Sequence, residues 1–157
     1  MNLRYRKADV SDIDILTSTR IEVLRAANRL SDDVDMDNVR VASYEYYRKA
    51  LNENSHTAYL VLDDDVFVGA GAISYYQVMP TYHNPSGIKG YIMNMYTKPD
   101  YRRKGIAFRT LELLVEDARY RGVSAISLEA TEMGRPLYEK FGFISSKDEM
   151  EYPVDVI

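Results

Sequence analysis

A basic cluster followed by a glycine separates a strand-like segment from an amphipathic helix in the second half of the chain. The apolar segment YIMNMYT (91–97) has the composition of a strand, and three cations at 102–104 lead into Gly105. Beyond the glycine, apolar side chains recur at helical spacing: Ala107, Leu111, Leu114, Val115 and Ala118. A helix begins with free N–H groups and a partial positive charge, and a glycine there permits a tight turn. The pattern therefore predicts a strand, a turn and a helix that together bind a phosphate group.

Composition restricts what that anion can be. The 157 residues are 46% hydrophobic and 28% charged, with a formal net charge of -4, which predicts one globular domain over residues 1–157. A nucleic-acid-binding protein needs an extended basic face, so the net charge argues against a DNA-binding role for residues 102–104. The chain has no cysteine, which excludes disulfides, zinc–thiolate sites and a thiol nucleophile. The local basic cluster thus favours a small anion over a polyanion.

No segment predicts contact with a membrane. The N-terminal sequence MNLRYRKADV lacks the apolar core of a signal peptide, and no apolar run approaches the length of about 18 residues that a membrane span needs. We therefore expect a cytoplasmic protein with no membrane and no nucleic-acid partner.

Periodicity and turn residues predict a mixed α/β fold along the whole chain. Ser11 is expected to cap the first helix, and Gly122 to follow the end of the third. Gly69 and Gly71 indicate a bulge or a close approach within a strand. The expected strands are 3–8, two arms of a hairpin over 56–78, 91–97, 124–130, 142–146 and 149–154. The expected helices are 11–28, 38–52, the one after Gly105 and 134–140, with a loop over 79–90.

Other ligand motifs are incomplete. The chain contains neither G-x-x-x-x-G-K-S/T nor G-x-G-x-x-G, the phosphate-binding signatures of nucleotide hydrolases and dinucleotide enzymes. Asp33, Asp35 and Asp37 have the spacing of a calcium loop, but Asn38 replaces its glycine and Tyr44 its final glutamate. No metal site is therefore expected.

Two segments resemble the GNAT superfamily of N-acetyltransferases. The run Arg102-Arg103-Lys104-Gly105-Ile106-Ala107 matches the family's pyrophosphate motif, Q/R-x-x-G-x-G/A, and RPLYEKFGF (135–143) is similar to its LYEKxGF segment. A helix and a strand are expected between the two motifs, as in the family, and the order of elements fits as far as residue 154. The resemblance implies a central mixed sheet that splays between its fourth and fifth strands and is flanked by helices.

The resemblance also implies a site for acetyl-CoA as co-substrate. Backbone N–H groups of the pyrophosphate motif would cradle the pyrophosphate, and the strand before it would pair with the pantetheine arm inside the splay. Many members carry asparagine where this chain has Thr131, so Thr131 is not assigned a cofactor contact. The expected cofactor-binding residues are Met95, Tyr96, Thr97, Arg102, Arg103, Lys104, Gly105, Ile106 and Ala107.

Acetyl transfer to an amine requires a neutral amine, donors for the tetrahedral oxyanion and a proton for the departing thiolate. The resemblance places Tyr138 beside the sulfur of the coenzyme, where a phenol with a pKa near about 10 can act as the general acid. The alternative is that Tyr138 is a buried structural aromatic. Backbone N–H groups near Met95 and Tyr96 are candidates for the oxyanion, and the general base is not assigned. The polar residues considered are Glu129 as a base, His56 and His83 as surface histidines, and Asn94 as either an acceptor-site or an outward-facing residue.

The favoured interpretation is an acetyl-CoA-dependent N-acetyltransferase that moves an acetyl group to a primary amine by direct attack on the thioester. A small cationic acceptor is expected, because acidic residues lie in a connection that borders the acceptor cleft in the resembling family. These residues are Asp32, Asp33, Asp35 and Asp37, and the alternative is a solvated acidic loop with no role. The competing function is a non-catalytic acyl-CoA-binding regulatory module. A homodimer is an open option.

Overall fold

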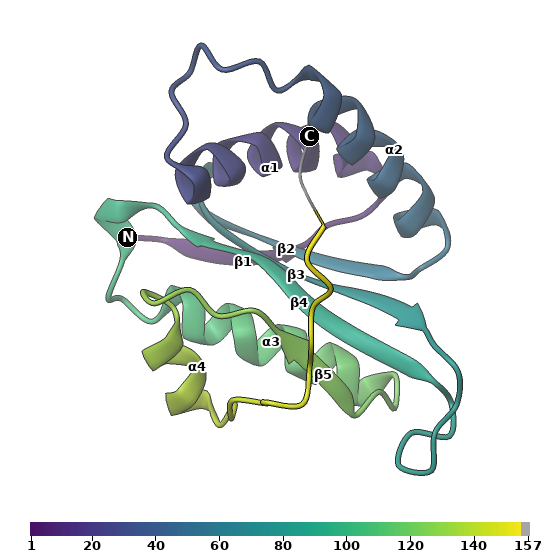
Figure 1. Cartoon of the computed structure of the whole chain (residues 1–157). Helices are drawn as coiled ribbons and strands as arrows, with labels where there is room; N and C mark the ends of the chain where they lie inside the picture. The colour runs from purple at the N-terminus through teal and green to yellow at the C-terminus, as the bar shows by residue number, and fades with distance from the viewer. Residues whose placement is uncertain (155–157) are drawn as a thin grey trace.

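The protein is built on a five-stranded mixed sheet in the order β1-β2-β3-β4-β5 (Figure 1). The computed structural model describes residues 1–154. The first four strands pair antiparallel with their neighbours, whereas β4 and β5 run parallel. The strands are β1 (Leu3–Lys7), β2 (His56–Asp63), β3 (Val66–Gln77), β4 (Ile88–Thr97) and β5 (Ala125–Leu128).

Helices cover both faces of this sheet, as the sequence predicts. α1 and α2 lie on one face, and α3 and α4 lie on the other (Figure 1). Their bounds are α1 (Ile13–Asn28), α2 (Asp37–Asn52), α3 (Ile106–Tyr120) and α4 (Arg135–Phe141), with short 3-10 turns at Val10–Asp12 and Pro99–Tyr101. Ser11 is not the cap that was expected. The chain turns two residues earlier, and the Asp9 carboxylate accepts a hydrogen bond from the Ser11 N–H at 2.8 Å.

Each face of the sheet buries its own apolar layer. Under α3, Ile73 and Ile92 of the sheet pack with Leu111 and Leu114, two members of the predicted helical stripe that are fully buried. Under α1 and α2, the layer is made by Ala8, Leu16, Tyr47, Ala58, Leu60 and Ala72. The period of 3.6 in the helices and of 2 in the strands thus places the core where the sequence predicts it.

The two closing strands predicted over 142–146 and 149–154 do not form in the described part of the chain. α4 ends at Phe141, and the Phe143 N–H still bonds back to the Tyr138 carbonyl at 2.9 Å. Beyond that bond, no backbone hydrogen bond joins residues 144–154 to β5. The apolar side chains that suggested strands, including Ile144 and Met150, are exposed. An alternating pattern makes a strand only where a ladder partner is present, so this prediction was wrong.

Two boundaries differ less from the prediction. β4 begins at Ile88 rather than at 91, because a bond from the Val78 N–H to the Gly87 carbonyl at 2.8 Å closes the preceding loop early. β5 ends at Leu128, two residues before the expected end. Among residues 1–154, no helix combines the length and the apolar character needed to cross a membrane.

Candidate active site

β4 and β5 diverge after four paired residues. Their parallel register runs from Lys89↔Ala125 to Ile92↔Leu128, where β5 ends, while β4 continues to Thr97 beside β3. Residues 93–97 therefore keep one edge without a strand partner among the described residues. The splay predicted between the fourth and fifth strands is present, and its free edge offers backbone donors and acceptors to an extended ligand.

A β-bulge lies where the two strands diverge. One residue of β3, Gly71, faces two residues of β4, Asn94 and Met95. Asn94 has a φ of 58°, in the left-handed region that asparagine tolerates better than most residues. A Cβ on Gly71 would lie 2.5 Å from Thr110 Cγ2 of α3 and 2.7 Å from Met95 Sδ, so only glycine fits there. The bulge interrupts the ladder and changes the direction of the β4 backbone at the mouth of the splay.

The turn that leads from β4 into α3 leaves its backbone donors free. Arg103 has a φ of 61°, and Gly105, the N-cap of α3, has a φ of 81°. Within residues 1–154, the N–H groups of Arg103, Lys104 and Gly105 donate to no backbone carbonyl, and no side chain caps the helix. A Cβ built on Gly105 would meet no atom within 4 Å, so the space in front of the helix is open. Free donors, exposed cations and open space together suit an anion.

Side chains hold this turn against the ends of β4 and β2. Arg102 Nε donates to the Thr97 carbonyl at 3.1 Å, and the Tyr101 hydroxyl donates to Asp63 Oδ2 at 2.7 Å. The Thr97 hydroxyl oxygen is buried and has no hydrogen-bond partner among the described residues. Because buried polar atoms are rarely left unpaired, this oxygen is an exception at the last residue of β4.

Tyr138 lies on α4 in the core cluster that packs against Met95 of β4 and Leu128 of β5, the two diverging strands. Its side chain is 9% exposed, and burial raises the pKa of the phenol above its ordinary value of 10.0. A Cβ on Gly134 would lie 3.0 Å from the Tyr138 ring, so glycine gives the ring its space. The hydroxyl makes no hydrogen bond to residues 1–154 and is not enclosed by them. Tyr138 is therefore a protonated phenol with a free hydroxyl.

Other residues considered from the sequence are not brought to this point. Glu129 is exposed just beyond β5, and His83 is exposed in the loop before β4, where its ring contacts Tyr82. The Thr131 hydroxyl accepts a hydrogen bond from the Gly134 N–H at 3.1 Å, so it organises the approach to α4. His56 was expected at the surface, and that prediction was wrong: it is 5% exposed, because it starts β2 beneath α2.

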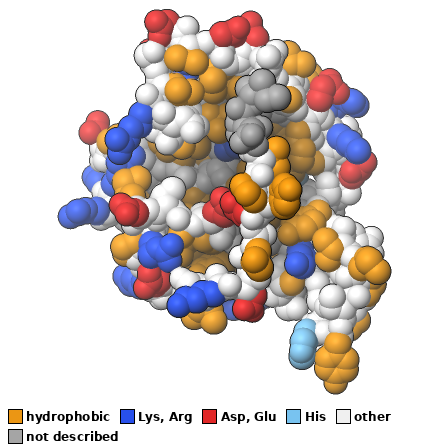
Figure 2. All heavy atoms as spheres, in the orientation of Figure 1, with side chains coloured by type: hydrophobic (Ala, Val, Ile, Leu, Met, Phe, Trp, Pro, Cys, Tyr) orange, Lys and Arg blue, Asp and Glu red, His pale blue; other side chains and the backbone are white. Residues whose placement is uncertain are grey.

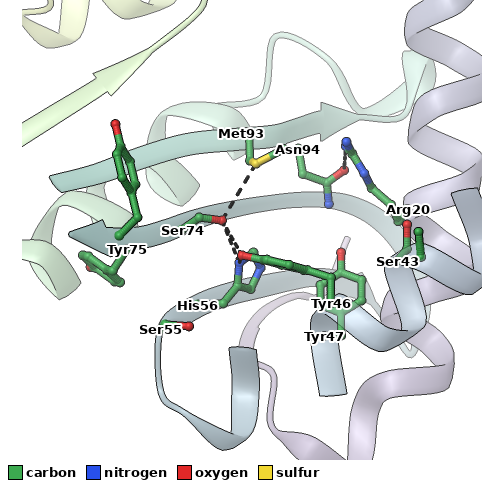
Figure 3. A pocket seen from close by; sticks show the side chains of 12 residues that line it. Arg20, Ser43, Tyr46, Tyr47, Ser55, His56, Ser74, Tyr75, Met93 and Asn94 are labelled. Atoms are coloured by element: carbon green, nitrogen blue, oxygen red, sulfur yellow. Dashed lines mark hydrogen bonds between the residues drawn. The ribbon is translucent and has the colours of Figure 1, made fainter. Parts of the chain in front are cut away.

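A cavity of about 400 Å³ opens on the α1–α2 face of the sheet, next to the bulge (Figure 3). It lies between α1, α2 and strands β2, β3 and β4, so Asn94 faces an internal space rather than pointing outward. Its volume falls in the range of small-molecule sites. The cavity is lined by Arg20, Ala42, Ser43, Tyr46, Tyr47, Ser55, His56, Ser74, Tyr75, Tyr76, Met93 and Asn94.

One wall of the cavity is a compact polar cluster (Figure 3). The Tyr46 hydroxyl lies 2.9 Å from His56 Nδ1 and 2.7 Å from Ser74 Oγ, and His56 Nδ1 lies 3.0 Å from Ser74 Oγ. Burial, together with the charges of Arg20 and Arg121, lowers the pKa of His56 from 6.5 to about 4. His56 is therefore neutral at pH 7, and its Nε2 is buried without a partner among the described residues.

Sequence reasoning missed this cavity, although two signals were present. Arg20 occupies the buried face of α1, four residues after the fully packed Leu16, where a charged residue is unusual. His56 and Ser74 are polar residues in otherwise apolar strands, and they stand directly opposite each other in the register of β2 and β3. Only the pairing of the strands shows that these positions meet.

The acidic segment between α1 and α2 does not line the cavity. Asp32, Asp33, Asp35 and Asp37 are exposed, and Figure 2 shows acidic side chains gathered at the upper edge of the molecule, over this connection. Three of these residues have local partners: the Ser31 hydroxyl donates to Asp33, Asp35 Oδ1 accepts from the Asp37 N–H at 2.9 Å, and Arg40 Nη1 donates to Asp37 Oδ1. Any effect of the segment on an acceptor therefore acts through its field rather than by contact.

Comparisons with known proteins agree with this geometry. The model of the Acetyltransferase (GNAT) family matches residues 24–143. N-acetyltransferase YsnE of Bacillus subtilis is 35% identical over 86 residues, which are 52% of this chain and 51% of that protein. N-alpha-acetyltransferase 30 of Schizosaccharomyces pombe is 29% identical over 104 residues, 64% of this chain and 66% of that one. The matched region thus spans about half to two thirds of these relatives.

Solved structures match over nearly the whole chain. A predicted acetyltransferase from Clostridium acetobutylicum, crystallised with acetyl-CoA, is 34% identical, with 96% of each chain covered and a TM-score of 0.86. A GCN5-related N-acetyltransferase from Ralstonia eutropha shares the fold at 23% identity, with 98% and 99% covered and a TM-score of 0.82. With the splayed sheet and the open turn before α3, these matches establish that the chain belongs to the GNAT family of acetyltransferases.

Proposed function

We propose that the chain transfers the acetyl group of acetyl-CoA to the primary amine of a small molecule. The observation that carries this proposal is the sequence of features along one strand: the β4 bulge, the unpaired edge of residues 93–97, and the open turn at Gly105. An extended thioester with a pyrophosphate at one end needs this succession of backbone groups. The family match and the acetyl-CoA-bound relative from Clostridium acetobutylicum support the same co-substrate.

Each part of the co-substrate then has a counterpart in the chain. The N–H groups from Arg103 to Ala107 bind the pyrophosphate, with Arg102, Arg103 and Lys104 supplying charge. The edge formed by Met95, Tyr96 and Thr97 pairs with the pantetheine arm. This assignment places the thioester carbonyl at the bulge, where N–H groups near Met95 and Tyr96 stabilise the oxyanion.

The chemical step follows from these positions. The neutral amine attacks the thioester carbon, the tetrahedral intermediate collapses, and the C–S bond breaks with its electron pair on sulfur. Tyr138 donates its proton to the departing thiolate, which a phenol with a raised pKa can do because it stays protonated until the thiolate forms. The ammonium formed on nitrogen loses its proton to solvent.

The acceptor is proposed to be a small molecule whose amine arrives as a cationic ammonium group. The cavity beside the bulge supports a small acceptor, since about 400 Å³ suits a metabolite and not a folded chain. The acidic segment supports attraction of a cation from outside the cavity. A cytoplasmic location and a homodimer stay predictions.

The test is release of free thiol from acetyl-CoA in the presence of a panel of primary amines, with the acetylated product identified by mass. Turnover with at least one amine supports the proposal. Tight binding of acetyl-CoA without turnover on any amine would contradict it and favour a non-catalytic acyl-CoA-binding module.

A further inference from the structure

The acceptor cavity contains one positive charge that its own lining does not neutralise. Of the twelve described residues that line it, Arg20 alone is charged at neutral pH, because His56 is neutral and neither aspartate nor glutamate is among them. Within residues 1–154, no carboxylate lies within 4.0 Å of the Arg20 guanidinium. Arg20 is half-buried, so an anion that enters the cavity can form a charge-assisted hydrogen bond with it.

Two other half-buried arginines of the fold are paired with carboxylates, whereas Arg25 donates to the Ser31 carbonyl. Arg6 Nη1 lies 2.9 Å from Asp12 Oδ2, and Arg121 Nε lies 3.0 Å from Asp117 Oδ2. Arg20 instead donates one hydrogen bond, from Nη1 to Asn94 Oδ1 at 2.9 Å (Figure 3). A guanidinium has five N–H donors in a planar fork, and most of the Arg20 donors make no hydrogen bond to residues 1–154. This fork matches a carboxylate in a two-point hydrogen bond.

We propose that the acceptor carries a carboxylate as well as its amine, and that Arg20 binds this carboxylate while the amine faces the β4 bulge. The inference rests on the proposed function and specifies the small-molecule amine as an amino acid, whose ammonium charge is balanced by its carboxylate. Because Arg20 is bonded to Asn94, the bulged residue itself, the two functional groups must be only a few bonds apart. An α-amino acid has that separation.

The other residues that line the cavity indicate which side chain the amino acid carries. Tyr46, Tyr47, Tyr76 and Met93 present aromatic rings and a thioether to the cavity, whereas the Tyr75 ring packs under α3 on the other face of the sheet and its hydroxyl donates to Asp117 Oδ2 at 2.7 Å. Such a surface favours an apolar or aromatic side chain over a charged one. The acceptor class is therefore an amino acid with an apolar or aromatic side chain.

The test compares three amines that share one skeleton: phenylalanine, phenylalaninamide and phenethylamine. The same three forms of leucine cover a smaller side chain. The readout is the ratio of kcat/KM for the acid to that for the amide. Arg20→Met removes the charge and Arg20→Lys keeps it. Arg48→Met is the matched control, because Arg48 is exposed on α2, pairs with Glu45 and does not line the cavity.

We expect the unmodified protein to prefer the acid over both other forms. Arg20→Met should lower the acid-to-amide ratio by about 10- to 100-fold, Arg20→Lys should lower it less, and Arg48→Met should leave it unchanged. An amide lowers the pKa of the neighbouring amine and so supplies more of the neutral nucleophile. A preference for the acid therefore cannot come from the reactivity of the amine.

Three results would overturn the inference. If Arg20 only held Asn94 in the bulge, Arg20→Met would slow acid and amide by the same factor and leave their ratio intact. Equal use of acid and amide by the unmodified protein would remove the need for a carboxylate. A stronger preference for O-phosphoethanolamine over ethanolamine than for phenylalanine over its amide would assign Arg20 to a phosphate.

Failure of the proposed function would look different. It would appear as absence of turnover on every amine, whereas failure of the inference leaves turnover without a carboxylate preference. If no amine is turned over, calorimetric titration of the coenzyme A-bound protein with phenylalanine and phenylalaninamide still tests whether Arg20 binds a carboxylate. Binding of the acid that is lost in Arg20→Met supports the inference, and equal or absent binding of the two forms overturns it.

Discussion

At the scale of single residues, Tyr138 combines burial with a hydroxyl that forms no hydrogen bond to residues 1–154. Removing that hydroxyl therefore leaves no buried polar group unpaired, and Tyr138→Phe should fold with a thermal midpoint close to that of the parent. We predict that kcat falls by about 10²- to 10⁴-fold, because the proton donor acts in the transition state only. The KM for acetyl-CoA should change little. A variant that retains full kcat would show that Tyr138 is only a packed aromatic.

Gly105 is the second residue at which one substitution separates binding from folding. Gly105→Glu should abolish binding of acetyl-CoA in calorimetric titration, because its carboxylate would enter the open space before α3 and repel the pyrophosphate. Its φ of 81° also strains any side chain, so the matched control is Gly122→Glu. Gly122 has a φ of 75°, follows the far end of α3 and faces equally open space. Loss of binding in both variants would point to backbone strain instead.

At the scale of elements, substitutions in the connection between α1 and α2 can test whether its acidic residues attract a cationic acceptor without contacting it. Asp33 and Asp35 lie outside the cavity, and exposed charges act over about 10 Å at 0.1 M salt. Asp33→Asn combined with Asp35→Asn keeps the oxygen that accepts from the Asp37 N–H. The double variant should raise the KM for an acceptor of net positive charge and flatten its dependence on ionic strength. The KM values for acetyl-CoA and for a neutral amino acid should not change, and an unaltered KM for the cation would make the segment a plain solvated loop.

At the scale of the whole molecule, local structure was predictable from the sequence, and contacts between segments distant in the sequence were not. The turn at Gly105 and the position of Tyr138 on a short helix depend on neighbours in the chain, so the sequence alone indicates them. The cavity depends on Arg20, His56 and Asn94, which come from three elements and meet only when the sheet is assembled. The pattern in 149–154 predicted a strand because alternation reports propensity, whereas pairing depends on a partner edge.

His56 links the stability of the whole fold to pH. Its pKa is lowered to about 4 in the folded protein by burial and by nearby arginines, whereas the unfolded chain binds this proton near 6.5. Between those values the unfolded state holds more protons, so the free energy of unfolding falls as the pH falls. The slope reaches up to about 1.4 kcal/mol per pH unit. Above pH 6.5 the contribution of His56 is fully present, and below about 4 its loss is complete.

Replacing the imidazole by an amide that does not titrate isolates this contribution. We predict that the stability advantage of the parent over His56→Gln, measured by urea unfolding, shrinks by about 2 kcal/mol between pH 6.5 and pH 4.5. Carboxylates titrate in both proteins and cancel in the difference. His83→Gln is the matched control for replacing an imidazole by an amide at an exposed position. A difference for His56→Gln that does not vary with pH would mean that the cavity accepts a charged imidazole beside Arg20.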